Sequence, residues 1–262
     1  MKRIALQAGV VSVLTGALAL SGCAGGYDQA SRAGTYEGPP TAVGEGEARS
    51  FVTLDAQGEP IALGVRLSPA ALTGLPSDVG HAGPAVEYRL DLPPEAAATG
   101  YDHVTVDWNP HGHFPPGVYD VAHFDFHFYL IDDEARNRIT GEGEDRARAS
   151  KAPATEFMPA GYVLPEGTDE PRMGAHAIHP GAPEFNQQPF TKTFIYGFYD
   201  GEMVFVEPMV TKAFLETRAD VREAIPLPER YHRTAYYPTE YRVGYDAETE
   251  AHVVVLEGLV RH

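Results

Sequence analysis

Four of the chain's 11 histidines lie between residues 109 and 130, at spacings typical of a metal site. His123, Asp125 and His127 alternate there with three phenylalanines. Because side chains at positions i, i+2 and i+4 of a β-strand share a face, this alternation predicts a strand with one polar face and one aromatic, core-forming face. Imidazole nitrogens and carboxylate oxygens bind divalent transition metals such as Zn, Cu or Fe. The pattern therefore predicts a transition-metal site on the polar face.

Two histidine pairs outside this strand are further candidates. His111 and His113 precede it, and the turn at 115–117 (Pro-Pro-Gly) folds them back toward the strand. His176 and His179 lie in a proline-flanked loop. Since loops often carry functional side chains on a rigid scaffold, we expect this second pair to complete a site begun by the strand.

Glu207 is an acid in an otherwise apolar strand, where an unpaired buried carboxylate would be costly, so we expect a base or a metal beside it.

The spacing of His123 and His127 is long for ligands of one ion. At about 3.3 Å per residue, positions 123 and 127 lie about 13 Å apart along a regular strand. One ion can bind both histidines only if the strand bends. The alternatives are a site that uses one of the two, a pair of sites, or a polar network without metal.

A family resemblance rests on three motifs in this sequence. They are Gly112-His113-x-Pro-Pro-x-x-Tyr119-x-x-x-His123-Phe-Asp-Phe-His127-Phe-Tyr129, Met173-Gly174-x-His176, and Glu207-Pro208-Met209. Together they resemble a family of secreted bacterial proteins of unknown function, over approximately residues 50–215. The resemblance implies that the ligands are His113, His123, His127 and His176, with Glu207 as a nearby acid. Asp125 shares the face of His123 and His127, so it is either a ligand or, as we favour, a hydrogen-bond acceptor that fixes an imidazole tautomer. His111 and His179 are expected to support the ligands.

The number of ligands leaves the function open. Three protein ligands with a free position are typical of catalytic zinc sites, whereas four are typical of structural sites. The chain contains no Gly-x-Ser-x-Gly nucleophile motif and no phosphate-binding glycine loop. Two hypotheses follow: a metal-binding protein, in one form a metal-dependent enzyme acting on a small molecule, or a structural or interaction module whose histidines form a polar network. The single histidines at positions 81, 103, 232, 252 and 262 are expected to be ordinary residues.

The first 22 residues have the pattern of a secretory signal. Lys2 and Arg3 precede a mostly apolar segment, 4–20, which is too short for a dedicated membrane span. The segment 20–23 (Leu-Ser-Gly-Cys) resembles the bacterial lipobox, which implies cleavage before Cys23 and lipidation of its thiol. We therefore expect an extracytoplasmic protein anchored to a bacterial membrane. Cys23 is the only cysteine, so neither a disulfide within the chain nor a thiolate ligand is expected.

The chain is acidic. Its formal charge is −17, and removal of residues 1–22 takes away Lys2 and Arg3 and no acid, which gives 18 − 37 = −19. Such a surface repels nucleic acid and anionic lipid headgroups. A small-molecule ligand and a homo-oligomer are both compatible with this composition.

The alternation of residues favours an all-β or β-rich fold: a single sandwich-like or barrel-like domain with a few short helices. We expect a flexible tether at 23–48 and one domain at 49–262. Strands are predicted at 50–54, 61–67, 86–92, 103–108, 123–131, 191–199, 203–210, 241–245 and 252–256, and helices near 68–72, 133–138 and 212–224. Asp200-Gly201 supplies the positive φ angles of a tight hairpin turn.

Overall fold

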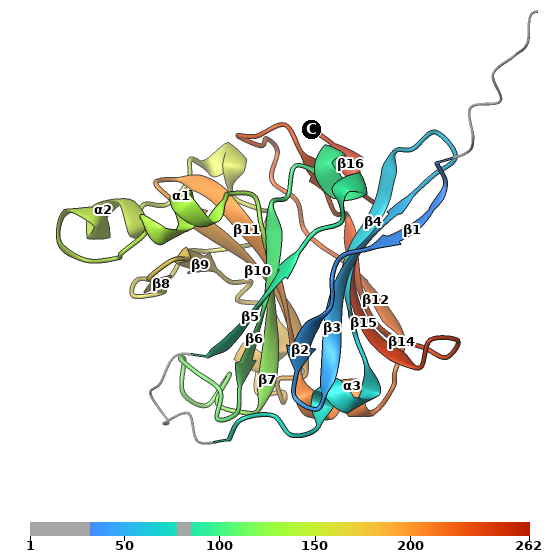
Figure 1. Cartoon of the computed structure of the whole chain (residues 1–262). Coiled ribbons are helices and arrows are strands. Elements are labelled where there is room, and N and C mark those ends of the chain that lie inside the picture. Colours follow the sequence, from blue (N-terminus) through green and yellow to red (C-terminus); the bar gives the residue numbers. More distant parts are fainter. Residues whose placement is uncertain (1–31, 78–84) are drawn as a thin grey trace, which may run out of the picture. The chain divides into compact units, whose positions relative to one another are not determined.

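Antiparallel sheets dominate the computed structural model, which describes residues 32–77 and 85–262 (Figure 1). The signal segment, Cys23 and His81 lie outside the described residues. The chain divides into two units between Ala30 and Ser31, and every described residue belongs to the second. Within 32–77 and 85–262, no helix has the length and apolar character that crossing a bilayer requires.

Most strands belong to two seven-stranded sheets. The first has the order β1 (Gly34–Glu37), β3 (Gly46–Leu54), β4 (Pro60–Leu67), β15 (Ala251–Glu257), β14 (Glu240–Asp246), β12 (Val221–Ala224), with β2 (Thr41–Val43) paired to β3. The second has the order β5 (Val86–Asp91), β6 (His103–Asn109), β7 (His123–Tyr129), β11 (Glu202–Thr211), β10 (Lys192–Tyr199), β9 (Gly174–Ala177), β8 (Asp169–Glu170). A short pair joins β13 (Tyr236–Tyr237) to β16 (Val260–Arg261).

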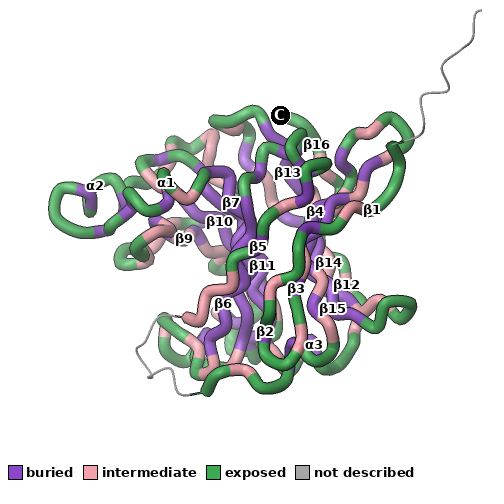
Figure 2. Tube along the Cα trace, in the orientation of Figure 1, coloured by how far each residue is buried: buried purple, intermediate pink, exposed green. Residues whose placement is uncertain are grey.

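The helices are short, as predicted. They are α1 (Asp133–Asn137), α2 (Arg146–Ala149) and α3 (Lys212–Glu216), with 3-10 turns η1 (Pro69–Leu72), η2 (Pro94–Thr99), η3 (Gly143–Asp145), η4 (Thr155–Phe157) and η5 (Pro183–Phe185). The largest hydrophobic cluster draws buried side chains from both sheets, among them Val52 and Val254 from the first and Phe126 and Val206 from the second. Figure 2 shows the buried segments along the strands of both sheets. The β-rich, sandwich-like fold class is therefore confirmed.

Strand β7 has the phase that its alternation predicts. Phe124, Phe126 and Phe128 lie in the core between the sheets and are fully buried. The histidines and Asp125 point to the opposite face of the second sheet, and they too are buried. Apolar side chains from the segments before β7 and between β7 and β10 pack on that face, among them Tyr119, Ile139, Phe185 and Phe190. The predicted metal ligands thus lie beneath a cover of loops and short helices.

Two element predictions at the edges of the first sheet were wrong. The expected tether reaches only part of 23–48, because strands begin at Gly34: β1 pairs with β3 at 51–54, and β2 pairs with the start of β3. The expected helix at 212–224 ends at Glu216, and 221–224 forms strand β12 at the edge of the first sheet, paired with β14. In both places the polar, glycine-rich or charged composition concealed a strand.

A third difference concerns Ser68. It precedes Pro69, as a helix N-cap would, but its hydroxyl accepts a hydrogen bond from the Glu47 backbone N–H at 3.0 Å and makes no side-chain cap. The segment 69–72 is a single 3-10 turn. The segment 141–152, for which no element was predicted, contains η3 and α2.

Candidate metal centre

The register of the second sheet determines which polar residues meet. Asp107 on β6 lies opposite Asp125 on β7. On the other side of β7, Phe205 pairs with Tyr129 and Met209 with Asp125, which places Glu207 across from His127. Polar side chains from three adjacent strands, β6, β7 and β11, therefore meet on this face.

His176 was expected in a loop, but it lies on strand β9 and reaches the same face from there, one strand beyond β10. Gly197 of β10 lies between His176 and Phe205 in the register. A Cβ at Gly197 would come within 2.1 Å of the Phe205 ring, so that ring lies over the glycine. The Phe205 ring packs against His127 and His176, with ring centroids 4.8 and 5.3 Å apart. Because Gly197 has no side chain, the Phe205 ring can lie over it and contact both histidines.

The six predicted or neighbouring ligands form two separate groups, each with two histidines and one carboxylate. We call them the first triad (His113, His123, Asp125) and the second triad (His127, His176, Glu207). Within each triad the candidate ligand atoms all lie within 4.8 Å of one another.

In the first triad the carboxylate faces both imidazoles. Asp125 Oδ1 lies 3.1 Å from His123 Nε2, and its Oδ2 lies 3.4 Å from His113 Nε2. In the second triad, Glu207 Oε1 lies 3.5 Å from His127 Nε2 and Oε2 lies 3.8 Å from His176 Nε2. A divalent ion placed among either set would be contacted by two nitrogens and one oxygen, a common donor set for Zn²⁺ and Fe²⁺.

Every histidine of the triads presents Nε2 inward because its Nδ1 is engaged elsewhere. The Nδ1 partners are the backbone oxygens of Phe114 (2.8 Å), Val121 (2.6 Å) and Thr168 (2.8 Å) for His113, His123 and His176, and Asp107 Oδ2 (3.3 Å) for His127. Protein histidines that bind metals almost always donate their other ring N–H to a carbonyl or carboxylate in this way. The arrangement holds each ring in the tautomer and orientation that a metal ligand needs.

Several inward-facing atoms make no hydrogen bond within the described residues. They are His123 Nε2, Asp125 Oδ1, His127 Nε2 and Glu207 Oε2, all buried. Leaving a buried polar atom without a hydrogen bond costs about 1–3 kcal/mol, and more when the group is charged. One metal ion in each triad would coordinate these four atoms, so the residues of both triads fit a metal ion.

The carboxylates alter the proton affinities of the triads. Burial alone would lower the pKa of His127, but Glu207 and Asp107 outweigh it and raise this pKa to about 9. Asp125 likewise outweighs burial and raises the pKa of His113 to about 9. Burial raises the pKa of Glu207 to about 8 and lowers that of His176 to about 4. The metal-free triads therefore hold protons at neutral pH that a metal ion would displace.

Metal-free protein should lose stability as the pH rises from 6.5 to 9. The raised pKa values of His113 and His127 stabilise the fold fully below the unfolded-state value, 6.5, and this contribution is lost as pH passes through about 9. Glu207 acts in the same direction between 4.5 and about 8, because the folded state retains its proton. Urea unfolding in chelator at pH 6.5 and pH 9 measures the change, and His127→Gln should reduce it. Equal unfolding midpoints at the two pH values would contradict these pKa shifts.

Of the other predicted residues, His111 and His179 make their contacts outside the triads, whereas Asp125 belongs to the first triad. His111 Nε2 lies 3.1 Å from the Ser77 backbone oxygen. His179 accepts a hydrogen bond from the Gly181 N–H and packs against Tyr162. Asp125, expected to support the ligands, is itself within ligand distance in the first triad.

Two supporting residues on β6 were missed by sequence reasoning. Asp107 engages His127 Nδ1, and Asn109 Nδ2 donates to Asp125 Oδ2 at 2.7 Å. Strand β6 alternates as β7 does: the polar residues at 103, 105, 107 and 109 share the triad face, while Val104, Val106 and Trp108 lie in the core. This second period-two pattern was the available signal.

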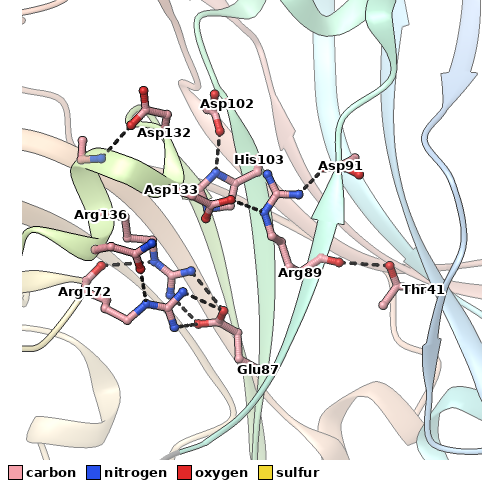
Figure 3. Close-up of polar contacts among 12 residues, drawn as sticks. Thr41, Glu87, Arg89, Asp91, Asp102, His103, Asp132, Asp133, Arg136 and Arg172 are labelled. Carbon is pink, nitrogen blue, oxygen red and sulfur yellow. Dashed lines mark hydrogen bonds and ion pairs between the residues drawn. The ribbon is translucent and has the colours of Figure 1, made fainter.

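His103, expected to be ordinary, is fully buried at the far end of the same face. Its Nδ1 lies 2.8 Å from Asp102 Oδ1, and its ring stacks on Tyr129. On the neighbouring strand β5, across from Asp107, Glu87 receives hydrogen bonds from both Arg136 and Arg172 (Figure 3). The Arg136 guanidinium also lies over the Tyr129 ring, 4.3 Å from its centroid. These contacts attach the covering segment to the end of β7.

Comparison with known proteins gives one partial similarity. Residues 55–108 match the family described as TTHB210-like, Hypothetical protein TTHB210, which is about a fifth of the chain. The matched segment contains Asp107 but none of the six triad residues. The comparisons with curated proteins and with solved structures found no match.

Proposed function

We propose that this chain is an extracytoplasmic lipoprotein that binds divalent transition-metal ions at the two triads. The observation that carries the proposal is the anchoring of all four imidazoles through Nδ1, so that Nε2 and a carboxylate converge in each triad. Four inward-facing atoms of the triads also lack hydrogen bonds among the described residues, and metal coordination would engage them.

The donor set bears on the metal and on its use. Two imidazoles and a carboxylate suit Zn²⁺ or Fe²⁺, with Cu²⁺ as a further candidate. Three protein ligands leave a coordination position for water or substrate, which supports metal-dependent chemistry on a small molecule. An ion there would act as a Lewis acid and lower the pKa of bound water. The protein's residues would orient the ligands and exclude bulk solvent.

Elemental analysis of protein purified without an affinity tag and reconstituted with Zn²⁺ tests the proposal. We expect two ions per chain, one for each triad, and a fall in thermal stability when a chelator removes them. Substoichiometric metal whose removal leaves stability unchanged would support the alternative, a histidine–carboxylate network that only stabilises the sheet.

Asp107→Asn should weaken metal binding at the second triad by about 10- to 100-fold, the usual effect of losing a carboxylate that supports a histidine ligand. Competition with a chromophoric chelator measures the affinity. The matched control is Asp102→Asn, which removes a carboxylate beside His103 outside the triads and should leave the affinity unchanged. Equal affinities for Asp107→Asn and wild type would exclude a role for Asp107.

Cys23→Ser should release the protein from membranes into the soluble periplasmic or culture fraction. The expectation rests on the lipobox-like segment and on the charge of the mature chain, −19, which disfavours adhesion to anionic lipid. Fractionation in high salt measures it. A variant that still sediments with membranes would contradict lipid anchoring at this residue.

A further inference from the structure

The two triads differ in their access to solvent. The His113 side chain is 39% exposed, whereas the other five candidate ligands are buried or nearly so. His113 also lies on the loop between β6 and β7, while the second triad lies wholly on strands β7, β9 and β11. A small molecule from solvent therefore reaches the first triad more directly.

The loop that carries His113 has a defined conformation. Gly112 has a φ of +72°, and a Cβ there would lie 2.0 Å from the Tyr119 backbone oxygen. His113 N–H donates to that same oxygen at 3.2 Å. The loop is thus closed on itself, and it holds His113 against His123 with ring centroids 4.7 Å apart. Its exposure is compatible with a defined ligand position.

Apolar residues flank both histidines of the first triad in the chain. Phe114, 63% exposed, directly follows His113, and Val121, 44% exposed, lies two residues before His123. Tyr119 packs edge-on against His113 and Phe190 edge-on against His123, with centroids 5.7 and 5.4 Å apart. Exposed aromatic and aliphatic groups beside buried polar ligands are typical of small-molecule sites, where a few polar groups orient a mainly apolar ligand.

The second triad is enclosed by comparison. The Phe205 ring covers His127 and His176, and Tyr129 stacks parallel to His127 at 5.7 Å. His127 and Glu207 are almost fully buried. The most accessible of its three side chains is that of His176, 15% exposed, so an ion held there is more enclosed than one beside His113.

We propose that an ion at the first triad takes an exogenous ligand, a small molecule with an anionic oxygen donor on an apolar group, whereas an ion at the second triad is enclosed. The inference rests on the proposed function. A divalent ion with Asp125 as its one anionic protein ligand would carry a formal charge of +1, which favours an anionic donor at the open position. The exposed Phe114 and Val121 side chains would receive the apolar group.

Azide titration of the Co²⁺-loaded mature chain tests the assignment, because azide binding to an open position changes the visible absorption of cobalt. Wild type should bind two Co²⁺ and respond to azide. His176→Ala should bind one and still respond, whereas His113→Ala should bind one and not respond. A response that survives His113→Ala and is lost in His176→Ala would overturn the inference, as would two bound Co²⁺ with no response in wild type. A wild-type chain that binds no Co²⁺ would contradict the proposed function itself.

A competition experiment tests the class of ligand. Benzoate and acetate carry the same donor, so their ability to displace azide isolates the apolar group. We expect benzoate to bind about tenfold more tightly, equivalent to about 1.4 kcal/mol. Phe114→Ala should remove most of this preference, measured as the ratio of benzoate to acetate affinity in the variant itself. Equal affinities for benzoate and acetate in wild type would overturn the apolar part of the inference.

Discussion

His127→Ala should abolish metal binding at the second triad while leaving the first triad loaded. His127 supplies one of three ligand atoms there, and its Nε2 faces Glu207 Oε1 at 3.5 Å. Loss of a residue that only supports a ligand reduces metal affinity about 10- to 100-fold, so loss of the ligand itself should reduce it by more than about 100-fold. Isothermal titration of metal-free protein with Zn²⁺ should therefore show one strong site in place of two.

The matched control for this variant is His252→Ala. His252 is also buried, but it lies on β15 in the first sheet, away from both triads. Its substitution should leave two strong sites. If His127→Ala retained both, the second triad would not be a metal site.

Phe126→Ala should destabilise the fold by about 3–5 kcal/mol, the usual effect of truncating a fully buried aromatic side chain. Phe126 lies in the core between the sheets, on the opposite face of β7 from the triads. Metal content per folded molecule should therefore stay at the wild-type value. Chemical unfolding at saturating Zn²⁺, with elemental analysis of the folded fraction, measures both quantities.

Phe114→Ala is the control, because the same truncation at an exposed loop position should change the free energy of unfolding by no more than about 0.5 kcal/mol. A Phe126→Ala variant with wild-type stability would contradict the core placement. One that lost its metal while folded would contradict the separation of the two faces of β7.

Much of the architecture could be predicted from local patterns. The alternation at 123–129 determined both the strand and its phase, since only one face of such a strand can carry the aromatic side chains into a core. The hairpin at Asp200-Gly201 was equally local, because the turn requires positive φ angles that these residues adopt. Strands were missed at 34–48, 174–177 and 221–224, where short segments rich in glycine, alanine or polar residues lack the alternation that marks β7.

The grouping of the ligands could not be predicted from spacing alone. The strand pattern showed that His123 and His127 share a face. The rise per residue showed that one ion can bind both only if the strand bends. Which partners each histidine meets depends on the register of β11 and on the pairing of β9 with β10. Those pairings bring Glu207 and His176 to His127, and the closed loop brings His113 to His123.

Anomalous X-ray scattering from crystals of the Zn²⁺-reconstituted protein, measured at the zinc absorption edge, would locate the bound ions. We expect two peaks on the outer face of the second sheet, one about 2.0–2.2 Å from Nε2 of His113 and His123, the other at the same distance from Nε2 of His127 and His176. Crystals with full zinc in the surrounding solution and no anomalous peak at either triad would contradict both metal sites.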